Sequence, residues 1–124
     1  MTGDVTALDR VGIVRTSGDF AGAVRSLAGD ITNVLVGGHV TDSLFEGVRI
    51  GGVRALGDFT NSTVDAASLG RVLVGGRISE DASDGDVDVI QSFGGRFLVR
   101  DAFGAAVITD GRSQFFGGAE ARVL

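Results

Sequence analysis

A repeat of about 19 residues constrains this chain more than any other feature of its sequence. The heptads "VLVGGHV" (34–40) and "VLVGGRI" (72–78) are nearly identical, and they alternate with the related pair "VRTSGDF" (14–20) and "VRALGDF" (53–59). The glycine before the polar residue anchors each copy, with spacings of 20, 19, 19 and 19 residues: Gly18, Gly38, Gly57, Gly76 and Gly95. A repeat of this length predicts stacked units that bury their apolar faces against one another.

Apolar residues recur at fixed distances from the anchor glycine. The column two residues after it reads Phe20, Val40, Phe59, Ile78 and Phe97. The column four residues before it reads Val14, Val34, Val53, Val72 and Gln91. The column two residues before it reads Thr16, Val36, Ala55, Val74 and Phe93, and the column seven before it reads Val11, Ile31, Ile50 and Leu69. Apolar positions alternate with others within each copy, which is the periodicity of β-strands.

These columns predict an all-β fold: a single-domain parallel β-helix (β-solenoid) of about 19 residues per coil, with five to six coils. Equivalent residues would stack about 4.8 Å apart. We expect residues 1–124 to form one domain, in which 1–10 is an N-terminal partial coil or cap, 11–100 holds five repeats and 101–124 is a C-terminal cap. The alternation of phenylalanine with Val or Ile predicts a core that fills in pairs of coils.

The composition narrows the chemistry available to the chain. Its 124 residues contain no Cys, and all eleven basic residues are Arg, so thiolate, Schiff-base and Walker-lysine chemistry are excluded. A net charge of −5 predicts no nucleic-acid partner. No run of residues is apolar enough to span a membrane. The start "MTGDVTALDR" shows no signal peptide, which keeps a cytoplasmic location open.

One acidic cluster, "EDASDGDVD" (80–88), is a candidate metal site. Asp81, Asp84, Asp86 and Asp88 offer the carboxylate oxygens that Ca²⁺ prefers. Their spacing is not that of an EF-hand loop, and the liganding glutamate at its far end is missing. The alternative is a solvated turn in which Asp and Gly serve turn geometry. No other cofactor is predicted.

Three further features lie on the predicted outer surface. The only histidine, His39, falls in a polar column with Asp19, Asp58, Arg77 and Arg96, which predicts a surface ladder with Asp58 beside Arg77 and no catalytic role. A second outward column reads Arg15, Leu35, Arg54 and Leu73, and it could support lateral association. Asn61 begins a formal glycosylation sequon, "NST", and is interpreted as a turn residue.

Units such as "ITNVLVGGHVTDSLFEGV" and "VRALGDFTNSTVDAASLGRVLVGGRISE" resemble the repeats of very large, Gly-rich surface proteins of high-GC bacteria, planctomycetes in particular. The resemblance covers about residues 7–100. It implies an extracellular structural or adhesive role, with no catalytic residues to carry over. A looser resemblance is to the bactofilins, short bacterial β-helices that polymerise end to end without nucleotide, and it implies an intracellular filament.

The favoured function is therefore a non-enzymatic structural β-solenoid, self-associating through its coil ends or adhesive, whose partner is another copy of itself. The first alternative is the bactofilin-like filament. The second is a polysaccharide-acting β-helix enzyme, in which Asp84, Asp86 and Arg77 or Arg96 would imitate a calcium-dependent lyase site. The short turns between repeats disfavour the enzyme, because they leave no loops long enough to build a cleft.

Overall fold

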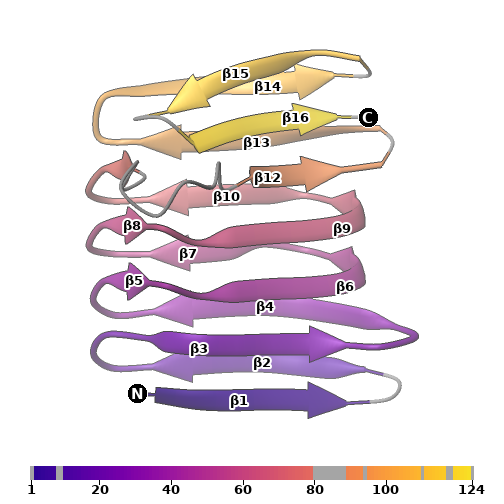
Figure 1. Ribbon diagram of the computed structural model, residues 1–124, viewed down its shortest axis with the longest axis vertical. Helices are drawn as coiled ribbons and strands as arrows, with labels where there is room; N and C mark the ends of the chain where they lie inside the picture. The colour runs from indigo at the N-terminus through magenta and orange to yellow at the C-terminus, as the bar shows by residue number, and fades with distance from the viewer. Residues whose placement is uncertain are drawn as a thin grey trace.

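A computed structural model describes residues 2–7, 10–79, 89–93, 95–109, 111–116 and 119–123. It confirms the all-β class: a β-solenoid of about 4 turns with a spacing of about 19 residues. The coils stack along the long axis, with β1 at one end and β14–β16 at the other (Figure 1).

The strands form three walls, and the third is formed by the middle coils only. Wall 1 consists of β1 (Thr2–Ala7), β3 (Ala21–Ser26), β6 (Leu44–Ile50), β9 (Thr63–Leu69), β12 (Val89–Ser92) and β16 (Ala119–Val123). Wall 2 consists of β2 (Val11–Thr16), β4 (Asp30–Val36), β7 (Val53–Ala55), β10 (Arg71–Val74) and β13 (Arg96–Asp101). The short wall 3 consists of β5 (Val40–Thr41), β8 (Phe59–Thr60) and β11 (Ile78–Ser79). Two more strands, β14 (Gly104–Thr109) and β15 (Ser113–Phe116), end the stack.

The registers of the first four copies confirm the predicted columns. In wall 2, Val34 pairs with Val14 below it and Val53 above it, and Val53 pairs in turn with Val72. In wall 3, Val40 pairs with Phe59. These strands are parallel, so each residue type repeats along the axis and a column of valines forms one continuous strip of the core.

The core explains why the coils alternate in sequence. Phe20 and Phe59 point inward from wall 3, and Phe45 points inward from wall 1 in the coil between them, where wall 3 supplies only Val40. The ring centroids of Phe20 and Phe45 are 5.6 Å apart, and those of Phe45 and Phe59 are 6.4 Å apart. Each of these coils thus has one phenylalanine, and its side of the core switches from coil to coil. The phenylalanine in wall 1 was not predicted. Above Phe59 the inward residues are Ile78 in wall 3 and Ile90 in wall 1, so the alternation does not continue and packing in pairs of coils stays a prediction.

The predicted fifth copy is wrong in register. Val72 pairs with Val99 and not with Gln91, and Gln91 lies in wall 1 beside Asp65. Phe97 is buried, but in β13 instead of wall 3, and Phe93 is 55% exposed. The reason is length: Ile90, the partner of Val64, follows Ser79 by 11 residues, whereas Val64 follows Thr60 by 4. Gly95, taken as an anchor, is a turn glycine with φ of 76°.

The chain reverses at the C-terminal end of the stack. β14 pairs antiparallel with β13, and β15 pairs antiparallel with β16, whereas β16 itself lies parallel to β12. Ile108 of β14 and Phe116 of β15 are both buried, so apolar side chains close the core at this end.

Candidate functional site

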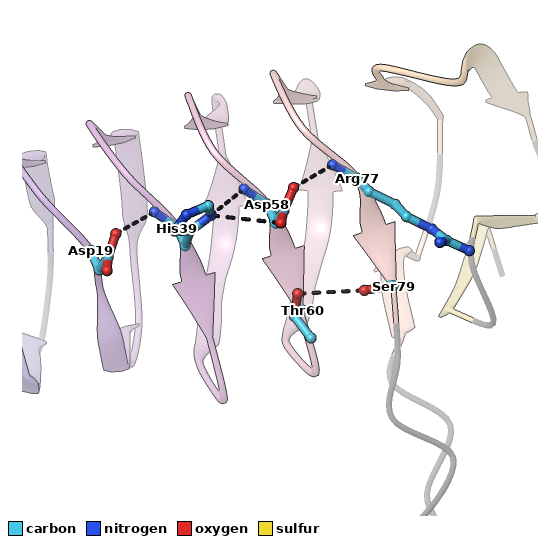
Figure 2. A network of polar contacts seen from close by, with 6 residues as sticks. All are labelled: Asp19, His39, Asp58, Thr60, Arg77 and Ser79. Carbon is cyan, nitrogen blue, oxygen red and sulfur yellow. Dashed lines mark hydrogen bonds and ion pairs between the residues drawn. The ribbon is translucent and has the colours of Figure 1, made fainter.

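A ladder of side chains runs up the corner between wall 2 and wall 3 (Figure 2). The Oδ1 of Asp19 accepts a hydrogen bond from the main-chain N–H of His39, at 2.7 Å. The Nδ1 of His39 accepts from the N–H of Asp58 at 2.8 Å, and the Oδ1 of Asp58 accepts from the N–H of Arg77 at 2.9 Å. The predicted order of this column is confirmed up to Arg77. Arg96 is not part of it, because it begins β13.

This ladder explains the anchor glycines. A Cβ at Gly38 would collide with the Oδ1 of Asp19, and one at Gly76 would collide with the Oδ1 of Asp58. A Cβ at Gly57 would lie 2.5 Å from the Nδ1 of His39. Glycine recurs there because the accepting side chain of the previous coil occupies the space that a Cβ would need.

His39 serves this ladder as a hydrogen-bond acceptor. Since Nδ1 accepts from a main-chain N–H, the ring proton is placed on Nε2. The Oδ2 of Asp58 lies 3.8 Å from Nδ1, and both side chains are about half exposed. The ring thus takes the place that an aspartate fills in the neighbouring coils.

The other sequence-predicted site residues are four aspartates outside the described residues and two arginines within them. Asp81, Asp84, Asp86 and Asp88 lie outside the described residues, so the predicted calcium site stays a prediction. Within the part of the chain that the structure describes, no group of three or more His, Asp or Glu side chains could hold a metal ion. Arg77 lies in the turn between β10 and β11, whereas Arg96 begins β13, and the Arg77 guanidinium stands 5.8 Å from the ring centroid of Phe103.

The predicted Arg–Leu column is confirmed and runs one rung further than expected. Register places Arg15, Leu35, Arg54, Leu73 and Arg100 side by side up the outside of wall 2. The arginines are exposed and the two leucines are half-buried. We call this surface the Arg–Leu ladder. Sequence analysis missed Arg100 because the lengthened coil moved it out of the expected spacing.

A second set of corners uses left-handed residues. Asp42 and Asn61 have φ of 47° and 50°, conformations that Asn and Asp tolerate better than most residues. The next residues, Ser43 and Ser62, are buried, and the N–H of Ser43 donates to the Oγ of Ser62 at 3.1 Å. The interpretation of Asn61 as a turn residue is confirmed.

Asp101 is a structural acceptor that sequence analysis missed. In the lower coils the N–H of Phe59 donates to the carbonyl of Arg77 in the next coil. At the last rung the N–H of Ile78 donates instead to the Oδ2 of Asp101, at 3.1 Å. The Oδ1 of the same buried carboxylate accepts from the N–H groups of Phe103 and Gly104. One side chain thus replaces the strand that would have continued wall 3.

The N-terminal end of the stack is built differently. Among the described residues, β1 pairs only with β3 and β2 pairs only with β4. Val5, Ala7 and Val14 pack against the core but stay only partly buried. Within the described residues, the outer edges of β1 and β2 therefore carry no neighbouring strand, and the core beside them is incompletely covered.

Comparisons with known proteins add no relatives: no family model, no curated protein and no solved structure matches this chain. In the described part of the chain, no helix is long and apolar enough to cross a membrane.

Proposed function

We propose that this chain is a structural, non-enzymatic β-solenoid that associates with a second copy of itself through its N-terminal coil. The observation that carries the proposal is the difference between the two ends. At the C-terminal end, Ile108 and Phe116 close the core and Asp101 satisfies the last strand. At the N-terminal end, β1 and β2 offer strand edges beside partly buried valines. Unpaired edges over apolar surface favour strand addition.

The association is head to head. Two N-terminal coils related by a twofold axis pair β1 with β1 and β2 with β2 in antiparallel fashion, which gives an isologous, closed dimer. A dimer of this kind doubles the length of the rod and covers Val5 and Val14. The resemblance to repeats of bacterial surface proteins supports a scaffolding or adhesive role outside the cell. An end-to-end filament is the competing outcome.

Proline substitutions test the proposal at each end separately. The carbonyl of Ala7 accepts from the N–H of Leu27 in the next coil. The main-chain N–H and C=O groups of consecutive residues in a strand point to opposite edges of that strand. The N–H of Thr6 therefore points to the open edge, and Thr6→Pro removes an edge donor while leaving the β1–β3 pairing intact. The matched control is Ser113→Pro in β15: the carbonyl of Arg112 accepts from Val123, so the N–H of Ser113 also points outward.

The measurement is the molar mass in solution, by sedimentation equilibrium across a concentration range, with circular dichroism to check the fold. We expect the unmodified chain to form dimers, Thr6→Pro to be monomeric and Ser113→Pro to remain dimeric. A monomeric unmodified chain contradicts the proposal, as does a dimer lost only in Ser113→Pro. Filaments sensitive to both variants would show that both ends engage, and would replace the dimer by a polymer.

A further inference from the structure

The outer surface of wall 2 differs in charge from the rest of the molecule. Although the chain has a net charge of −5, the strands of this wall contain five arginines: Arg15, Arg54, Arg71, Arg96 and Arg100. They contain two acidic residues, Asp30, which begins β4 opposite Arg49, and Asp101, which is buried. The surface of wall 2 is therefore cationic.

These arginines have no acidic partners within the described ranges. The arginine ion pair found there joins Arg122 to Glu120, both in β16 on wall 1. On wall 1 the corresponding column mixes charges, because it reads Arg25, Glu46, Asp65, Gln91 and Arg122. A row of exposed cations without counter-charges is a surface that an anionic ligand stabilises.

The surface of the Arg–Leu ladder contains two hollows. One hollow, of about 290 Å³, lies over Leu35 and is bounded by Arg15 and Arg54. A second hollow, of about 380 Å³, lies over Leu73 and is bounded by Arg54 and Arg100. Arg54 and Leu56 line both hollows. Both hollows thus have a leucine between two arginines. The second is also lined by Asp101, whose carboxylate already accepts the N–H groups of Ile78, Phe103 and Gly104.

The period of the ladder defines the ligand. Arginines recur at every second coil, which is about 10 Å for a strand spacing of about 4.8 Å. A β-strand peptide presents side chains on one face at intervals of about 6.8 Å. Its carboxylates would therefore not match the spacing of the arginines. In an extended polysaccharide the length of one sugar along the chain is about equal to the spacing between two neighbouring coils. A chain with an acidic sugar at every second position therefore sets each carboxylate at an arginine.

We propose that the Arg–Leu ladder binds an extended anionic polysaccharide whose carboxylates alternate with neutral sugars. Arg15, Arg54 and Arg100 each take one carboxylate, in the planar geometry that guanidinium groups favour. The neutral sugars lie over Leu35 and Leu73, whose side chains meet the C–H faces of the rings. This inference does not depend on the dimer, because the ladder lies along the side of the rod and not at its ends.

Nucleic acid and membrane surfaces fit the ladder less well. Binding of single-stranded nucleic acid relies on aromatic side chains that stack on bases, and the exposed phenylalanines of the described residues, Phe93, Phe103 and Phe115, lie outside the ladder. A membrane surface needs positive charge but no fixed period, so it leaves the repeated hollows unexplained.

Calorimetry with hyaluronan oligosaccharides, in which glucuronate alternates with N-acetylglucosamine, tests the proposal on the full chain at low salt. The hexasaccharide supplies three carboxylates and spans the ladder, so we expect it to bind at least about tenfold more tightly than the disaccharide. Arg54→Gln removes the cation shared by both hollows and should weaken hexasaccharide binding about tenfold. Arg25→Gln on wall 1 makes the same charge change and should alter it by less than about twofold.

Controls separate this ligand from others. Neutral N-acetylglucosamine oligomers should not bind, and added salt should weaken hyaluronan binding because the contacts are ionic. Equal losses in Arg54→Gln and Arg25→Gln, or equal affinities for hexasaccharide and disaccharide, would overturn the proposal. So would binding of duplex DNA or of anionic vesicles, sensitive to Arg54→Gln, in the absence of hyaluronan binding. Thermal melts of both variants establish that neither loss reflects unfolding.

Discussion

The regular coils and the C-terminal end provide hydrogen-bond partners for their main-chain groups in different ways. Between β3 and β10 every strand of a wall has a neighbour one coil away, so main-chain groups pair with main-chain groups. Beyond β11 wall 3 stops, and the carboxylate of Asp101 takes over as acceptor while β14 and β15 turn back over the core. A repeat can therefore be ended by one well-placed side chain and a change of strand direction.

The largest expected difference between the two regions lies in the core. Phe45 is fully buried between Phe20 and Phe59, where coils on both sides prevent collapse. Phe45→Ala should therefore lower the free energy of unfolding by about 4 kcal/mol, near the middle of the range for buried phenylalanine. Phe116 is 6% exposed at the end of the stack. Phe116→Ala should lower the free energy of unfolding by about half as much, because the end of the stack can relax around the cavity more easily.

Urea denaturation of the two alanine variants measures this difference. Equal losses would mean that the C-terminal end is as rigidly packed as the middle. A larger loss at Phe116 would reverse the comparison, and would show that closing the core limits the stability of the whole stack.

The same comparison shows how far the sequence could be read. The columns through Val34, Val53 and Val72 predicted the parallel walls, because identical residues at equal spacing have one simple arrangement. The prediction failed after Ser79, where the spacing from Val72 to its partner Val99 is 27 residues instead of 19. "GGRF" at 94–97 imitates the anchor motif, but Gly95 has a positive φ and no neighbour within 4 Å of a Cβ.

The candidate surfaces were predictable to different degrees. The Arg–Leu ladder and the His39 column follow from the repeat, since outward positions repeat as inward ones do. Their chemistry does not follow, because the acceptor role of Nδ1 and the two hollows depend on side-chain geometry. The role of Asp101 could not be predicted from the repeat. It occurs once, where the repeat ends, so no equivalent residue recurs in the other coils.

Removing Asp101 should weaken the C-terminal end next most strongly. Asp101→Ala leaves the N–H groups of Ile78, Phe103 and Gly104 without their acceptor, and hydrogen bonds to a charged group contribute about 1.5–3 kcal/mol. We expect a loss of about 2–3 kcal/mol in the free energy of unfolding. Hydrogen exchange should show the loss of protection first at Ile78 and last in the middle coils.

Asp58→Ala is the matched control in a regular coil. Asp58 accepts one main-chain hydrogen bond, from Arg77, and its side chain is about half exposed. Its removal should cost no more than about 1 kcal/mol, since water can replace an exposed acceptor. If Asp58→Ala costs as much as Asp101→Ala, the carboxylate at the end of the stack has no special role in stopping the repeat.

The last comparison is between two glycines of one column. A Cβ at Gly76 would collide with the Oδ1 of Asp58 and lie 2.9 Å from the main-chain carbon of Gly57. Gly76→Ala should therefore destabilise the chain by about 1–2 kcal/mol through overpacking. Gly18 occupies the same position in the first copy with nothing within 4 Å of a Cβ and no positive φ, so Gly18→Ala should be neutral or slightly stabilising. Matched thermal melts measure both, and equal losses would show that the glycines serve the conformation of the turn and not the close approach of one coil to the next.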